Sequence, residues 1–313
     1  MNRSVTGLIC LAVSGIVARH PAAQAQPVFS LDFANGLEGW TSTGSPPLWH
    51  VAQAGECAAV TAMAACNQGP ASCDYAADFP PLALLRLTSP SLGLLPDPTT
   101  TYVLEFDYMK GVDATGDVAT VWMGETSDGI WWPLAGYLLG DLPDSSSLVH
   151  YAKAYSFGDF WAGKAVHFEL ELQVDAIGNQ GPGWLVDNLQ LSTNAFADLG
   201  AGKGSPAPEL EGLGTLWVDS LNTLLLSAAQ PTSTGRFVFG LAQLGAPFKG
   251  GVMVPDPQFM LPLVTDAAGA AKLQFVLPAG LPAGQAFYVQ AWITDPDESF
   301  GLAASNGLVG VTS

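Results

Sequence analysis

The feature that most constrains the fold is a regular alternation of apolar and polar residues in two segments, Thr101–Met109 and Val166–Val174. In each of them, every second residue is apolar. A period of two predicts a β-strand with one buried face and one polar face. We take the polar faces as candidate ligand-binding surfaces. Their polar residues are Glu105 and Asp107 in the first segment and His167, Glu169 and Glu171 in the second.

The rest of the chain also has a sequence pattern typical of β-strands. Short apolar segments are separated by clusters of Gly, Pro, Asp and Ser, and no long helical period interrupts them. This pattern predicts an all-β fold: an antiparallel jelly-roll sandwich followed by a second, smaller β-sandwich. A Gly-, Ser- and Pro-rich stretch at residues 198–208 predicts a linker between them. The predicted boundaries are 1–25 for a signal peptide, 26–195 for the jelly roll, 196–210 for the linker and 211–313 for the second sandwich.

Five further strands are expected in the second half. They lie at Thr215–Val218, Thr223–Ser227, Arg236–Leu244, Ala271–Val276 and Ala286–Ile293.

The first 25 residues have the form of an export signal. A short basic start at Met1–Arg3 precedes the apolar segment Val5–Ala18, which is too short for a stop-transfer helix. Ala23-Gln24-Ala25 is an A-x-A cleavage site, so we expect the mature protein to begin at Gln26 and to be secreted or held at the cell surface. No later apolar run approaches the length of a membrane span.

The net charge of the chain excludes some classes of binding partner. The sequence has a formal net charge of −18, which becomes −20 if Arg3 and Arg19 leave with the signal. This balance argues against nucleic acid, which requires a basic surface, and against anionic membranes. Neutral glycans, cations and basic proteins remain compatible partners. The acidity also fits a simpler role in keeping an exported protein soluble.

Three cysteines remain in the mature chain, at Cys57, Cys66 and Cys73. An oxidising compartment favours a disulfide. We favour Cys66–Cys73, because the turn-forming sequence between them closes a small loop and leaves Cys57 unpaired. A Cys57–Cys73 bond is the alternative, and spacing alone leaves both open.

The sequence carries few signs of catalysis. It contains no H-E-x-x-H zinc motif, no G-x-S-x-G nucleophile elbow and no phosphate-binding Gly loop. Glu169 and Glu171 would lie about 7 Å apart on one strand face, near the separation of glycosidase carboxylates. Neighbours on a single exposed face are more commonly a solvated surface. We therefore expect no enzyme.

A pair of tryptophans suggests a different function. Trp131 and Trp132 follow a turn, and adjacent strand residues face opposite sides. One indole is expected in the core and the other outside, where it could stack on a sugar ring. The alternative is that loops cover both of them.

Four segments, taken in order, resemble motifs of the MAM-like and immune-inhibitor-A-like jelly-roll domains of secreted proteins. The resemblance implies an antiparallel jelly roll of the galactose-binding-like kind, with its first and last strands side by side. It covers nearly all of residues 27–193. The segments are Leu31–Trp40, Glu125–Leu134, Trp161–Leu170 and Gly183–Leu191.

The same resemblance implies a structural calcium ion near those two strands. Asp187 is the first candidate ligand on the matching positions and Asp32 the second. Ala34 departs from the pattern, because it stands where the family commonly has an acidic residue. Asp187 could equally be a buried carboxylate that binds backbone amides.

The second half resembles a C-terminal β-sandwich appended to many exported bacterial proteins of unassigned role. The similar segments are Ala246–Pro255, Leu261–Gly269, Phe287–Pro296 and Ala304–Leu308.

Together these features predict an exported, non-catalytic β-sandwich protein that binds an extracellular glycan or protein. A structural or spacer protein of the cell surface is the alternative, and an undetected hydrolase comes third.

Overall fold

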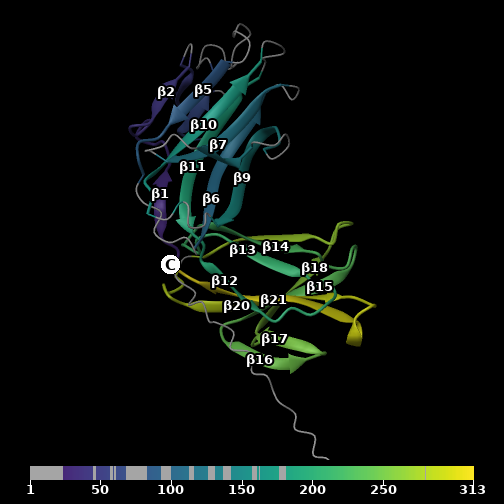
Figure 1. Cartoon of the computed structure of the whole chain (residues 1–313). Coiled ribbons are helices and arrows are strands. Elements are labelled where there is room, and N and C mark those ends of the chain that lie inside the picture. The colour runs from purple at the N-terminus through teal and green to yellow at the C-terminus, as the bar shows by residue number, and fades with distance from the viewer. Residues whose placement is uncertain are drawn as a thin grey trace, which may run out of the picture.

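A computed structural model describes residues 24–44, 47–56, 59, 61–67, 83–92, 100–112, 116–125, 131–136, 142–156, 161, 163–175, 181–278 and 280–313. Within them, regular structure is β-strand apart from short 3-10 turns such as Ser299–Gly301. All strand pairs are antiparallel, which confirms the predicted all-β class. Figure 1 shows the earlier strands gathered in one body and the later strands in another.

The first body contains two sheets. The six-stranded sheet I comprises β1 (Pro27–Leu31), β3 (Trp49–Ala52), β4 (Met63–Cys66), β6 (Thr101–Gly111), β9 (Ser145–Ser156) and β11 (Gly183–Thr193). The five-stranded sheet II comprises β2 (Thr41–Thr43), β5 (Ala83–Thr88), β7 (Val118–Glu125), β8 (Trp131–Ala135) and β10 (Val166–Val174).

The strand order of sheet I is β3-β4-β11-β6-β9, and β1 also pairs with β11, so the first and last strands lie side by side. The order of sheet II is β2-β5-β10-β7-β8. The two sheets share one apolar core, which is filled by the even-numbered residues of β6 and β10. Phe168, Leu170 and Trp184 are fully buried there. The alternation that identified β6 and β10 therefore also fixes which of their faces is internal.

The second body also contains two sheets. Sheet III comprises β12 (Phe196–Gly200), β15 (Thr234–Gly240), β18 (Phe259–Val264), β20 (Ala286–Thr294) and β21 (Leu302–Val311), in the order β12-β21-β20-β15-β18. Sheet IV comprises β13 (Glu209–Leu213), β14 (Leu221–Ser227) and β19 (Ala271–Val276), in that order. A separate hairpin pairs β16 (Gln243–Phe248) with β17 (Gly251–Pro255).

The predicted linker at 196–210 differs from the structure. Its first residues form β12, which pairs with β21, and its last residues begin β13. Phe196 is buried and contacts Phe287 edge to face, at 5.9 Å between ring centroids. Composition alone missed β12, because a Gly-rich segment can still form an edge strand when one large side chain anchors it.

Two predicted strands of the second half also differ. Thr215–Val218 is not a strand, and Leu216 within it has a positive φ of 53°. Arg236–Leu244 divides between β15 and β16. A Cβ atom at Gly240 would lie 2.0 Å from the Asp256 carbonyl oxygen, so only glycine allows this close approach at the end of β15. The other three predicted strands correspond to β14, β19 and β20.

The predicted signal peptide lies mostly outside the described residues. Of its 25 positions only Gln24 and Ala25 are described. Gln24 Nε2 donates to the Thr312 carbonyl oxygen at 3.2 Å, and Ala25 N donates to Ser313 Oγ at 3.0 Å. Cleavage and export stay predictions. No helix in the described ranges is long and apolar enough to cross a membrane.

Candidate functional site

The candidate ligand-binding residues do not form one site. His167, Glu169 and Glu171 lie on the outer face of sheet II, together with Trp131 of the neighbouring edge strand. Glu105 and Asp107 lie on the outer face of sheet I. Since the two sheets enclose one core, these outer faces look in opposite directions.

On sheet II, Arg86 of β5 forms ion pairs with both Glu169 and Glu171. Its Nε lies 2.7 Å from Glu171 Oε2 and 3.2 Å from Glu169 Oε1. Thr88 Oγ1 donates to the other oxygen of Glu169 at 2.8 Å, and Trp122 Nε1 donates to that of Glu171 at 3.2 Å. Both glutamates are buried. Each carboxylate oxygen thus already has a donor, so the pair is a fixed ion cluster and not a freely solvated face.

Burial shifts the pKa values of two groups on this face, Glu169 and His167. It raises the pKa of the Glu169 carboxyl, an effect to which the nearby charge of Glu171 adds and which the Thr88 hydrogen bond and the Arg86 charge oppose. Burial lowers the pKa of His167, so this imidazole is neutral at pH 7. Arg86 is therefore the cation on which this cluster depends in the described part of the chain.

Replacing that cation is expected to destabilise the first body. Arg86→Met should lower the free energy of unfolding by about 2 kcal/mol at pH 7, because it leaves two buried carboxylates unpaired. The pKa of Glu169 is raised in the folded state, so its negative charge destabilises the fold above that pKa. The stability lost on Arg86→Met should therefore be smaller at lower pH, where Glu169 becomes protonated. Urea unfolding at pH 7 and pH 5 measures both effects. Adding Glu169→Gln to Arg86→Met should recover part of the loss, and an equal loss at both pH values would contradict this account.

The two tryptophans lie on the edge strand β8. Trp131 is opposite Gly124, where a Cβ atom would come within 2.8 Å of both the indole and the His167 ring. The glycine therefore makes room for the edge-to-face contact of Trp131 with His167, at 4.4 Å between ring centroids. Trp132 points to the other side of β8 and is 56% exposed. Neither indole enters the core, contrary to the expectation for one of them, because no strand in the described part of sheet II lies beyond β8.

On sheet I, a second polar cluster joins β6, β9 and β11 around His150. Its Nδ1 lies 2.8 Å from Asp107 Oδ1, and its Nε2 lies 3.8 Å from Glu105 Oε1. Asn188 donates to the other oxygen of Asp107 at 2.8 Å, and Gln190 donates to that of Glu105 at 2.6 Å. His150 was not among the predicted site residues, because its partner Asp107 lies 43 residues away along the chain.

Burial alone would lower the pKa of His150. The hydrogen bond to Asp107 and the charges of Asp107 and Glu105 outweigh it and raise this pKa to about 9. Burial opposes ionisation of Asp107 too, but its bonds with His150 and Asn188 keep the Asp107 pKa below its ordinary value. At neutral pH the cluster is an imidazolium between two carboxylates.

The predicted calcium ligands are occupied by protein donors. Thr61 Oγ1 donates to Asp187 Oδ2 at 2.5 Å, the Asn188 amide donates to Asp187 Oδ1 at 2.8 Å, and the Ala34 amide donates to Asp32 Oδ1 at 3.0 Å. Burial raises the pKa of Asp187, as do the charges of Asp107 and Asp32. Within the described ranges, no group of three His, Cys, Asp or Glu side chains could hold a metal ion. The pair alone therefore does not fit a calcium cage of about six to eight oxygens.

Of the two cysteines in the predicted disulfide, the structure describes only Cys66. Cys66 is buried on β4, and burial raises the pKa of its thiol. It forms no disulfide within the described ranges. Cys57 and Cys73 lie outside them, so the Cys66–Cys73 pairing stays a prediction.

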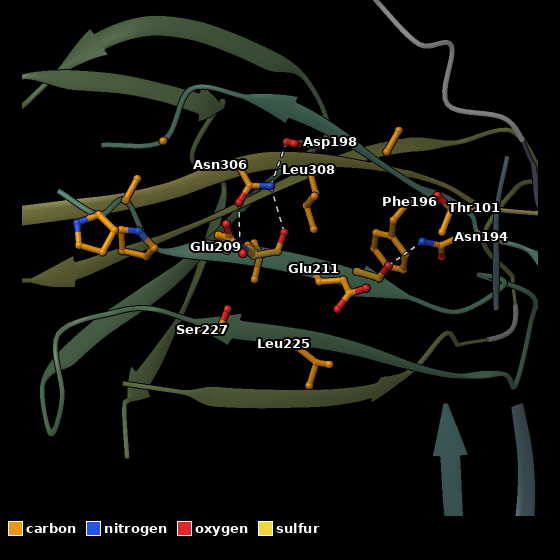
Figure 2. Close-up of a pocket in the computed structure, with 17 residues that line it drawn as sticks. Thr101, Asn194, Phe196, Asp198, Glu209, Glu211, Leu225, Ser227, Asn306 and Leu308 are labelled. Carbon is orange, nitrogen blue, oxygen red and sulfur yellow. Dashed lines mark hydrogen bonds between the residues drawn. The ribbon is translucent and has the colours of Figure 1, made fainter. Parts of the chain in front are cut away.

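A cleft of about 1030 Å³ lies between the edge strands β12 and β13, near the start of β6 (Figure 2). None of the described residues that line it is a Lys or an Arg. An acidic, partly apolar cleft of this kind attracts cations and repels anions. Its acidic residues are Asp198, Glu209 and Glu211, and its apolar residues include Phe196, Leu225 and Leu308.

Two asparagines cover the free edge of β13 in this cleft. Asn306 Oδ1 accepts from the Leu210 amide at 2.7 Å and its Nδ2 donates to the Leu210 carbonyl at 3.0 Å, while Asn194 Nδ2 donates to the Gly212 carbonyl at 2.7 Å (Figure 2). These backbone groups are therefore not available for the addition of another strand. Most of this region was predicted to be a linker, so no site was expected here. The alternating Glu209-Leu210-Glu211 was the available sign of a strand.

No protein-family model matches the sequence, and a search of curated proteins finds no match. Solved structures give weak likenesses. The K3 adhesin domain of Lys-gingipain from Porphyromonas gingivalis is 15% identical over 54% of this chain and 99% of that chain, with a TM-score of 0.30. The CBM22-1–CBM22-2 tandem of Paenibacillus barcinonensis Xyn10C is 13% identical over 94% of this chain and 92% of that chain, with a TM-score of 0.34.

The glycoside hydrolase domain Endo-D from Streptococcus pneumoniae is 9% identical, and the match covers 88% of this chain and 37% of that chain, with a TM-score of 0.28. All three TM-scores are below 0.5. We therefore base no functional argument on these likenesses.

Proposed function

We propose that the chain is an exported, non-catalytic binding protein whose first body holds an extracellular glycan against Trp132. The observation that carries the proposal is the 56% exposure of this large apolar side chain on the edge strand β8. An exposed indole offers an apolar face on which a sugar ring can stack.

The paired carboxylates support a binding role better than hydrolysis. A glycosidase needs one carboxyl group as an acid and a second as a nucleophile or base, each directed at the substrate. Glu169 and Glu171 are instead bonded to Arg86, Thr88 and Trp122. A spacer protein of the cell surface is the rival proposal, and it requires no exposed aromatic side chain.

A glycan array with the full chain, followed by calorimetry on the best ligand, tests the proposal. Trp132→Ala should weaken binding about 30-fold, which corresponds to about 2 kcal/mol for an aromatic binding residue. Leu148→Ala, which removes another exposed apolar side chain of the same body, is the control and should leave binding unchanged. If no glycan binds, or if the two variants behave alike, the spacer role is the better account.

A further inference from the structure

A second candidate site lies in the other body, where the β16–β17 hairpin folds across the outer face of sheet III. A groove of about 450 Å³ remains beside the edge strand β18. Arg236 lies on β15, next to the edge strand, opposite Trp292 of β20 on one side and Pro262 of β18 on the other. The groove is large enough for a small organic molecule.

One buried side chain fixes the wall of the groove. Gln290 is fully buried, and its Oε1 accepts from the Val254 amide and from Trp292 Nε1, both at 3.0 Å. Its Nε2 donates to the Val252 carbonyl at 3.1 Å. Gln290 thus ties both β17 and the Trp292 indole to the sheet, so the groove is formed before any ligand arrives.

The sides of the groove are apolar and open to solvent. Phe248, Met260 and Val264 line it and are 41%, 45% and 66% exposed. The Phe248 ring also contacts the Trp292 indole edge to face, at 5.1 Å between centroids. Apolar side chains gathered around one hollow favour a ligand that removes them from water.

Among the described residues of this lining, Arg236 is the one that carries a charge. It makes no ion pair with any residue that the structure describes. This is notable in a chain with a net charge of −18, in which carboxylates far outnumber cations. The hydroxyl groups of Thr234 and Thr294, 3.4 Å apart, add polar atoms to the same lining.

We propose that this groove binds a small amphipathic carboxylate. The guanidinium of Arg236 would pair with the carboxylate, and the apolar part of the ligand would lie against Met260, Phe248 and Trp292. Arginine suits this role because its planar donors match a carboxylate. The proposal is independent of the glycan site, since the two sites lie in different bodies.

The test is calorimetric titration of the full chain with octanoate, and with octanol as the uncharged probe. Octanoate should bind at one site about tenfold more tightly than octanol, because it adds a charge-assisted pair. Arg236→Gln should remove this advantage and leave octanol unaffected. Lys272→Gln, which removes an exposed cation from β19, is the matched control and should change neither titration.

A substitution in the apolar lining distinguishes the contribution of apolar contacts to binding from that of the Arg236 charge. Met260→Ser should weaken octanoate and octanol by the same factor, and circular dichroism should show that all three variants remain folded. The proposal is overturned if octanoate does not saturate a site, if it binds no better than octanol, or if Arg236→Gln and Lys272→Gln have equal effects.

Discussion

Replacing Trp184 with alanine is expected to lower the free energy of unfolding of the first body by about 4 kcal/mol, the largest stability effect that we predict. Trp184 is fully buried and contacts the Trp49 indole edge to face, at 5.6 Å between ring centroids. On β11 it stands between β4 and β6, opposite Cys66 and Lys110, so its removal leaves a cavity inside the sandwich. Guanidinium unfolding followed by circular dichroism measures the loss.

Two further substitutions make this prediction specific. Trp184→Phe should cost much less, since it keeps a ring in the core and removes an indole N–H that has no hydrogen-bond partner in the described part of the chain. Trp132→Ala removes the same side chain from an exposed position and should change stability by less than about 0.5 kcal/mol. Similar losses for Trp184→Ala and Trp132→Ala would show that burial does not determine these costs.

The alternation of residue types was sufficient to predict the central strands of the first body. The predicted segment Val166–Val174 has the same first and last residue as β10. Its five even-numbered residues are fully buried. A local period is enough here, because strand geometry alone decides which side chains share a face. The same reasoning placed the polar residues on the outer faces correctly.

Local pattern could not predict what those outer faces contact. Glu169 and Glu171 are buried because Arg86, about 85 residues away, reaches them across the paired strands. His150 reaches Asp107 in a similar way. Such pairings depend on strand order, and strand order is set by contacts between distant segments. The two polar faces predicted as candidate binding surfaces are therefore two separate clusters of paired side chains on opposite sides of the first body.

Edge positions were the other source of error. Trp132 is exposed, and not in the core, because β8 ends its sheet. The segment at 196–200 pairs along only one side, so few apolar residues are needed there and its composition resembled that of a linker. Sequence periodicity detects strands that are buried on one face more readily than strands at an edge.

Raising the pH from 6 to 10 is expected to lower the free energy of unfolding of the first body by about 3 kcal/mol through His150 alone. The pKa of His150 is raised to about 9 in the folded state, against about 6.5 in an unfolded chain. Between these values the folded state binds more protons than the unfolded state. The contribution is therefore complete below pH 6.5 and is lost as the pH rises through 9.

Urea unfolding across this range should show the fall for the unmodified chain and for His167→Gln. Burial lowers the pKa of His167, so this imidazole carries no charge near pH 9, which makes His167→Gln the matched control. His150→Gln should instead give a nearly flat profile, with low stability already at pH 6, because Glu105 and Asp107 then share one polar face without a cation. A fall of the same size in His150→Gln would assign the alkaline loss to other groups. The cluster would then be held by Asn188 and Gln190, and not by the charge of the imidazolium.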